Sequence, residues 1–237
     1  MCYHVKQTRK DREYLEASFD ADLRFEPVPV HYHVNGFARP ELMIITEQEP
    51  RVIQKGIWSV APPMCDDVEA YWKQKGGSVL NTRDDSLFSF KSAEWKTDAI
   101  LAHKCLVLVT GFYEPHKVGK DSYPYLLHRP DFEVFALCCY YTEQKDRKTF
   151  SVLTTEADAL MSKIHNAAKR MPMTLHPDDK EHYFSLDTET ALKEEFAKGY
   201  CITLDYRPVD RSVLNTRIDT NTPDILQEVV HPIITEF

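Results

Sequence analysis

The sequence contains little glycine, with 7 glycines among 237 residues, and none of them forms a phosphate-binding loop. Neither the G-x-G-x-x-G pattern of dinucleotide-binding folds nor the G-x-x-x-x-G-K-[ST] pattern of nucleoside-triphosphatases occurs. Both patterns place a glycine-rich turn ahead of a helix N-terminus, where backbone N–H groups bind phosphate. Their absence argues against a nucleotide-dependent enzyme.

The sequence also lacks an excess of positive charge. Its formal net charge is -8 and its isoelectric point is about 5.7. Proteins that bind nucleic acid through their overall charge are usually basic. Any DNA contact in this protein is therefore expected to depend on a local groove of arginine, lysine and aromatic side chains.

The six cysteines do not form a C-x-x-C motif, which argues against a zinc site and against thioredoxin-type redox chemistry. No apolar run reaches the ~18 residues of a membrane helix, and no charged-then-apolar leader begins the sequence. We therefore expect a cytoplasmic protein with reduced thiols, and without a membrane segment, a metal ion or a cofactor.

Segments typical of strands dominate the sequence and rarely alternate with helices. Apolar or alternating runs predict strands at 41–47, 52–60, 105–110, 123–128, 133–140, 149–155 and 201–213. Helices are expected at 10–25 and 93–102, and a loop at 84–86. This pattern favours an α+β fold, with one domain over residues 1–237 built around a largely antiparallel, barrel-like sheet with flanking helices.

Met1 and Cys2 begin the sequence. Removal of Met1 gives Cys2 a free α-amine beside its thiol. The ordinary pKa values are roughly 7.7–8.0 for the amine and 8.5 for the thiol, so both have a nucleophilic fraction near neutral pH. An aldehyde condenses with the amine, and the thiol then closes a five-membered thiazolidine ring. A cysteine at position 2 has no special role in most proteins, so this hypothesis needs support from the rest of the chain.

Several polar residues interrupt apolar or aromatic segments. Glu114 ends an apolar strand, where burial raises a carboxyl pKa towards the range of a general acid or base; a core ion pair with arginine is the alternative. His165 titrates near neutral pH, although a surface histidine at a helix end fits equally well. Asn81 and Arg83 are two residues apart on a strand and face the same side, as substrate contacts or as a hydrogen-bonding pair at a turn.

These residues belong to four motifs that follow Cys2 in a characteristic order. The motifs are Trp58-Ser59-Val60-Ala61-Pro62, Asn81-Thr82-Arg83, Gly111-Phe112-Tyr113-Glu114, and Ile164-His165 followed by Arg170-Met171-Pro172. They resemble the W-G-L-I-P, N-A-R, G-F-Y-E and H-x-R-M-P motifs of the SOS-response-associated peptidase (SRAP) family, whose members are also known as abasic-site-processing proteins. The resemblance extends over nearly the whole chain.

The resemblance implies covalent capture of abasic sites in single-stranded DNA. The ring-opened deoxyribose at such a site is an aldehyde. By similarity, the Cys2 amine attacks C1′ to give a Schiff base, and the Cys2 thiol closes the thiazolidine. Glu114 is expected to shuttle protons, and His165 to assist ring opening and proton transfer. Asn81 is expected to hold Cys2 or the sugar.

The resemblance also implies DNA contacts. Arg83 and Arg170 are expected to bind phosphates beside the lesion, and Trp58 is expected to stack on a base. His4 replaces an arginine of the family and is expected to contact phosphate when protonated, or through a neutral hydrogen bond. The implied partner is single-stranded DNA with abasic sites, bound by a monomer in the bacterial cytoplasm that associates with the nucleoid when it is on DNA.

The sequence departs from the family pattern near the nucleophile. The family usually begins Cys-Gly-Arg, whereas this chain has Cys2-Tyr3-His4, and extra residues separate His165 from Arg170. These changes concern DNA affinity more than the chemistry. Two further hypotheses remain open: a peptidase or autoprotease with Cys2 as its nucleophile, and a non-covalent module for single-stranded DNA. A lyase activity is also compatible with the resemblance.

Overall fold

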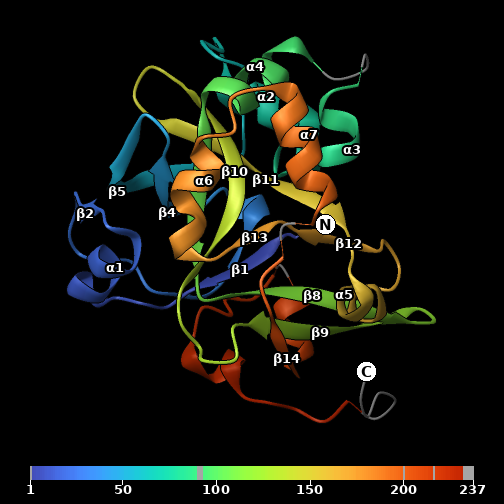
Figure 1. Cartoon of the computed structure of the whole chain (residues 1–237). Coiled ribbons are helices and arrows are strands. Elements are labelled where there is room, and N and C mark those ends of the chain that lie inside the picture. Colours follow the sequence, from blue (N-terminus) through green and yellow to red (C-terminus); the bar gives the residue numbers. More distant parts are fainter. Residues whose placement is uncertain (1, 90–92, 200, 216, 232–237) are drawn as a thin grey trace.

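The computed structural model describes residues 2–89, 93–199, 201–215 and 217–231. Two sheets form its framework, and helices pack around them (Figure 1). One sheet closes on itself, and the other lies beside it. In Figure 1, strand β1 (His4–Gln7) lies between the closed sheet and strand β8 (Gly111–Val118). The α+β class is confirmed, because strands and helices do not alternate regularly along the chain.

The closed sheet is a barrel of five strands: β4 (Glu41–Thr46), β5 (Glu49–Trp58), β7 (Lys104–Val109), β10 (Phe135–Glu143) and β11 (Lys148–Glu156). Antiparallel pairs join β5 to β4, β4 to β7, β7 to β10 and β10 to β11. A parallel pair between β11 and β5 completes the ring. The expected barrel-like, largely antiparallel sheet is therefore confirmed, with one parallel closure.

Short strands extend this barrel. Strand β6 (Asn81–Arg83) pairs in parallel with β11, and β12 (Arg170–Pro172) pairs with the same strand in antiparallel fashion. Strand β2 (Asp22–Leu23) adds to β5, and β13 (Thr174–Leu175) adds to β10. Because β6 and β12 both join β11, the N-x-R and R-M-P motifs flank the same strand although about 90 residues separate them in the sequence.

The second sheet is antiparallel and has the order β14 (Asp205–Pro208), β9 (Asp121–His128), β8, β1 and β3 (His31–Asn35). The pairing of β1 with β8 sets His4 opposite Tyr113. In this register Glu114 lies next to the two residues that precede β1. The fold thus brings the G-F-Y-E motif to the N-terminal end of the described chain.

The helices are α1 (Arg12–Phe19), α2 (Val68–Lys75), α3 (Asp84–Leu87), α4 (Glu94–Ala102), α5 (Ala159–Ile164), α6 (Lys180–Phe184) and α7 (Glu189–Ala197). Short 3₁₀ turns cover 36–38, 76–79, 177–179, 211–214 and 223–226. No helix in the described parts of the chain is long and apolar enough to cross a bilayer.

Three expectations about local structure were wrong. The helix predicted over 10–25 ends at Phe19, because Asp20 adopts the left-handed conformation (φ 45°) and closes the helix. The predicted loop at 84–86 is the short helix α3. The predicted strand over 201–213 is limited to Asp205–Pro208, and Arg211–Leu214 is a 3₁₀ turn begun by Asp210, whose side chain accepts from the Ser212 backbone N–H.

Candidate active site

Cys2 lies at the junction of the two sheets and is completely buried. The side-chain amide of Asn81, from β6 on the barrel, donates a 2.8 Å hydrogen bond to the Cys2 carbonyl oxygen. The Cys2 thiol lies 3.7 Å from the carbonyl oxygen of His4. Asn81 therefore holds the backbone of Cys2 against the barrel. Met1 lies outside the described residues.

Glu114 supplies a buried carboxylate beside Cys2. It is 0% exposed, and neither of its carboxylate oxygens has a hydrogen-bond partner within the described chain. Burial raises the pKa of Glu114, and the nearby His165 partly offsets that rise. A carboxyl group in this environment retains a proton at a higher pH than usual, so it can act as a general acid as well as a base.

His165 reaches Glu114 because α5 docks on β8. The Asp158 side chain caps the start of α5 by accepting from the Met161 backbone N–H at 2.7 Å. At the other end of the helix, the Lys163 carbonyl oxygen lies 2.8 Å from Nδ1 of His116 on β8. This contact places His165 Nδ1 3.4 Å from the Glu114 carboxylate.

One contact sets the protonation of the His165 ring. Its Nδ1 lies 2.8 Å from the carbonyl oxygen of Arg170, and a carbonyl oxygen only accepts, so Nδ1 carries the hydrogen. In the neutral ring, Nε2 then has the lone pair that accepts a proton. This arrangement gives a base at Nε2, with Glu114 close to the opposite nitrogen.

The Cys2 thiol is protonated at neutral pH. Burial is the main cause of its raised pKa, and the negative charge of Glu114 raises it further. The site therefore does not store a thiolate in the manner of a low-pKa cysteine. A reaction at sulfur needs a group that takes the thiol proton as the bond forms; Glu114 is the neighbouring carboxylate, and His165 lies beside Glu114.

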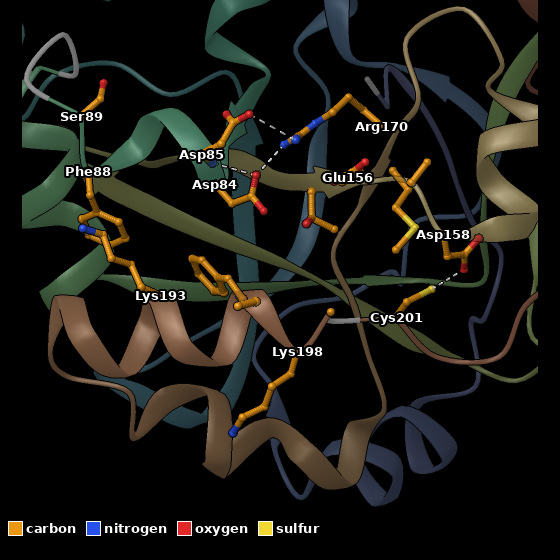
Figure 2. A pocket seen from close by; sticks show the side chains of 16 residues that line it. Asp84, Asp85, Phe88, Ser89, Glu156, Asp158, Arg170, Lys193, Lys198 and Cys201 are labelled. Atoms are coloured by element: carbon orange, nitrogen blue, oxygen red, sulfur yellow. Dashed lines mark hydrogen bonds and ion pairs between the residues drawn. The ribbon is translucent and has the colours of Figure 1, made fainter.

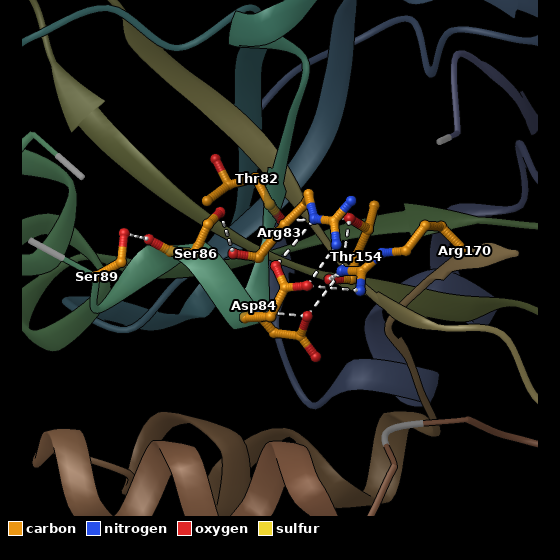
Figure 3. A network of polar contacts seen from close by, with 8 residues as sticks. Thr82, Arg83, Asp84, Ser86, Ser89, Thr154 and Arg170 are labelled. Atoms are coloured by element: carbon orange, nitrogen blue, oxygen red, sulfur yellow. Dashed lines mark hydrogen bonds and ion pairs between the residues drawn. The ribbon is translucent and has the colours of Figure 1, made fainter. Parts of the chain in front are cut away.

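The two arginines predicted to bind phosphate are both paired with carboxylates of α3 (Figure 3). Arg83 is exposed, and its Nε donates to Asp85 Oδ1 at 2.9 Å. Arg170 is only 6% exposed; its guanidinium donates to Asp84 Oδ1 at 2.7 Å and also to the Thr154 carbonyl oxygen. The phosphate role expected of Arg170 does not fit this geometry, because its fork is already occupied in the interior.

Arg170 instead acts as a support for His165. Its side chain ties β12 to α3 through Asp84, and its carbonyl oxygen orients the histidine ring. The carboxylates of Asp84 and Asp85 are residues that motif reading missed, although they follow Arg83 directly in the sequence. Two aspartates directly after an arginine are the sequence signal that the arginine charge can be neutralised within the protein.

The base contact expected of Trp58 is corrected, and so is one of the two phosphate contacts expected of His4; the contact through a neutral hydrogen bond stays a prediction. Trp58 is 0% exposed, its indole N–H donates to the Leu80 carbonyl oxygen at 2.9 Å, and its ring packs against Phe150, so it offers no face to a base. His4 stacks on His33 with ring nitrogens 2.9 Å apart. Burial, together with His33, lowers the pKa of His4 to about 3, so a phosphate contact through the protonated ring is excluded at neutral pH.

A cavity of about 880 Å³ lies beside Arg170, between α3 and α7 (Figure 2). Its acidic lining residues are Asp84, Asp85, Glu156 and Asp158, and its basic ones are Arg170, Lys193 and Lys198. Such a lining does not favour a polyanion. Within the described residues, no group of three or more His, Cys, Asp or Glu side chains is arranged to hold a metal ion.

Comparisons with known proteins agree with this geometry. The profile of the family described as SOS response associated peptidase (SRAP) matches residues 1–216. An abasic site processing protein of Saccharomyces cerevisiae is 28% identical over 154 residues, which cover 63% of this chain and 39% of that protein. The matched part of this chain thus spans well under half of that relative.

Solved structures share the fold. A protein of Bacteroides thetaiotaomicron superposes with a TM-score of 0.76 at 23% identity, over 97% of this chain and 100% of that one. A protein of Bordetella bronchiseptica superposes with a TM-score of 0.69 at 19% identity, over 88% of this chain and 100% of that one. At these identities the likeness establishes the fold alone.

Proposed function

We propose, since this chain belongs to the SRAP family, that it captures abasic sites in single-stranded DNA as a covalent adduct of Cys2. The proposal needs a mature chain without Met1, because the Cys2 nitrogen is otherwise a peptide amide and not a nucleophile. The adduct shields the lesion during the response to DNA damage. The name of the yeast relative, an abasic site processing protein, supports this substrate.

The chemistry combines one aldehyde with two nucleophiles. The neutral α-amine of Cys2 attacks C1′ of the ring-opened deoxyribose, and the resulting carbinolamine loses water to give a protonated Schiff base. The Cys2 sulfur then attacks the same carbon, and the thiol proton leaves to a base. The products are a thiazolidine and one molecule of water, and no oxidant or cofactor is consumed.

Glu114 and His165 suit the proton transfers of this sequence. Loss of water from the carbinolamine needs a general acid, and the raised pKa of Glu114 keeps a proton available there. Ring closure needs a base for the thiol, because burial and Glu114 raise the pKa of Cys2. Either the Glu114 carboxylate, after it has given up its proton, or Nε2 of His165 serves as that base.

A single observation carries the proposal: Asn81 and Glu114, from two distant segments, lie beside Cys2, and His165, from a third, lies beside Glu114. Asn81 fixes the Cys2 carbonyl at 2.8 Å, and Glu114 meets His165 at 3.4 Å. Glu114 has no hydrogen-bond partner in the described chain, and leaving a buried acceptor unpaired costs about 1–3 kcal/mol. An unpaired carboxylate is expected where a substrate or an amine completes the site.

A second candidate function follows from the same contacts. Cys2, His165 and Glu114 are the residue types of a cysteine peptidase, in which a histidine activates the thiol and an acid orients the histidine; Glu114 lies beside His165 as the acid of such a site would. Turnover of a peptide library in the absence of DNA would establish this activity, and dependence on His165 would link it to the site.

The test is a crosslinking gel with a single-stranded oligonucleotide that holds one abasic site. Intact mass first confirms that Met1 is absent. The wild type should give an adduct that survives heating, and Cys2→Ala should not. Cys2→Ala retains an α-amine, so borohydride should still trap its Schiff base, which separates the amine step from the thiol step.

Cys201→Ala serves as the matched control, because this half-buried thiol lies far from the site in the sequence and should leave the adduct unchanged. A heat-stable adduct with Cys2→Ala at the wild-type level would refute the mechanism centred on Cys2. Salt-sensitive binding without any covalent product in the wild type would instead favour a non-covalent module.

A further inference from the structure

A cleft of about 450 Å³ begins beside the nucleophile and differs in charge from the larger cavity near Arg170. Its wall includes Asn81, which holds Cys2, and it continues along α2 and the start of α4. The basic residues of its lining are Lys75, Arg83 and Lys96. Among the described residues, the lining of this cleft has no carboxylate, whereas four carboxylates line the larger cavity.

The two lysines of this cleft are not neutralised within the described chain. Neither Lys75 nor Lys96 forms an ion pair there; their ammonium groups lie over aromatic rings, 5.9 Å from the centroid of Tyr71 and 5.6 Å from that of Trp95. Burial lowers the pKa of Lys96, and the charge of Lys75 adds to this effect. Two cations thus repel each other in one cleft of a protein with a net charge of -8.

Hydroxyl groups complete the lining. Ser78, Ser86 and Ser89 lie along the cleft, and Figure 3 shows two of them, Ser86 and Ser89, on the α3 side with Arg83. Each of these hydroxyls donates its hydrogen to a backbone carbonyl oxygen, so the donors left for an anion are the lysine ammonium groups. A cleft whose described lining has two ammonium groups without ion pairs and no carboxylate is suited to an anion with spaced charges.

We infer that this cleft binds the phosphodiester backbone of single-stranded DNA next to the captured nucleotide, with Lys75 and Lys96 each contacting a phosphate. This inference rests on the proposed function and names the residues that deliver the strand to it. Tyr71 supplies the aromatic surface for a neighbouring base, a role that the buried Trp58 cannot fill. The route runs along α2 and α4, away from the acidic cavity at Arg170.

The experiment compares the double variant Lys75→Gln/Lys96→Gln with the wild type. Fluorescence anisotropy measures the Kd for an undamaged single-stranded oligonucleotide at several salt concentrations. Lys120→Gln is the matched control, because it makes a single charge change of the same kind at an exposed turn between β8 and β9. Circular dichroism and Tm check that all variants fold.

The expected result is a weaker affinity and a shallower salt dependence. Each lost phosphate contact lowers the slope of log affinity against log salt by about 0.7 for single strands, so the double variant should lose about 1.4. Between 50 and 200 mM salt, the wild type should therefore lose about sevenfold more affinity than the double variant. Lys120→Gln should keep the wild-type slope within about 0.2.

Crosslinking separates this inference from the proposed function. With saturating abasic DNA at low salt, the double variant should reach the wild-type yield of adduct, and only the DNA concentration for half-maximal yield should rise. If the wild type crosslinks but the double variant keeps the wild-type Kd and salt slope, the assignment of the cleft is wrong and the proposed function is not affected. Absence of any adduct in the wild type would refute the proposed function instead.

Discussion

Replacing Glu114 with glutamine tests the main electrostatic feature of the site. Glu114 is completely buried, its oxygens have no hydrogen-bond partner in the described chain, and burial raises its pKa. Glutamine has nearly the same shape but carries no charge at any pH. The substitution therefore removes the titration of this group while the packing of β8 is retained.

The direction of the pH effect follows from proton linkage. The folded protein binds the Glu114 proton more tightly than the unfolded chain does, so a rise in pH destabilises the wild-type fold. The loss begins near the ordinary carboxyl pKa of about 4.3 and continues until the pH passes the raised pKa of the folded state. Below this window the wild type and Glu114→Gln should show a constant difference in stability.

The magnitude has an upper limit. One titrating proton changes the free energy of unfolding by at most about 1.4 kcal/mol per pH unit. From pH 5 to pH 7 the difference between Glu114→Gln and the wild type should therefore increase by at most about 2.7 kcal/mol, in favour of the variant. For a protein of this size that corresponds to at most roughly 5–11 °C in Tm.

The assay is thermal unfolding from pH 4 to pH 8, on protein whose intact mass shows that Met1 is retained. The N-terminal amine lowers the pKa of Glu114, so the wild type and the variant are compared with the same N-terminus. The exposed Glu228 provides the control, because Glu228→Gln makes the same chemical change at a side chain that is not buried. A Tm difference between Glu114→Gln and the wild type that stays constant from pH 5 to pH 8 would refute the assignment of a raised pKa.

In the mature protein, Glu114→Gln should also slow crosslinking by about 10²–10⁴-fold.

Two further predictions test the support of the site. Arg170→Lys keeps the positive charge next to Asp84 but loses the guanidinium group that donates several hydrogen bonds. It should slow crosslinking and leave the Kd for undamaged single strands within about twofold of the wild type. A loss of affinity for undamaged single strands would show that Arg170 binds phosphate. Gly111→Ala should lower the free energy of unfolding by about 1–3 kcal/mol, because a Cβ at position 111 would lie 2.7 Å from the Leu127 carbonyl oxygen. Urea unfolding measures this change. An unchanged unfolding midpoint would show that β8 and β9 can move apart at this point without loss of stability.

Much of the fold was predictable, because local pattern and tertiary structure agree in the barrel. The apolar runs that predicted strands at 105–110, 133–140 and 149–155 correspond to β7, β10 and β11, which are buried along nearly their whole lengths. The boundaries that failed depend on single residues. Asp20 ends α1 through a left-handed backbone that no periodic pattern reveals.

The chemical types at the site also follow from the sequence. The resemblance of the motifs to those of the SRAP family was enough to select Cys2, Asn81, Glu114 and His165 as candidates, and contacts link these four residues in the fold. A general acid, an amide donor and a histidine are recognisable as residue types. Their roles in the reaction stay predictions until the variants are measured.

The DNA contacts were decided by tertiary structure. Whether a side chain offers its polar or aromatic surface to solvent depends on what packs over it, and those partners come from distant segments. Trp58 is covered by the barrel and Arg170 is neutralised by Asp84, whereas Lys75 and Lys96 form no ion pair with the described residues and line an open cleft. Residue type and order thus determined which groups are candidates for the chemistry, and burial and pairing decided which charges remain available at the surface.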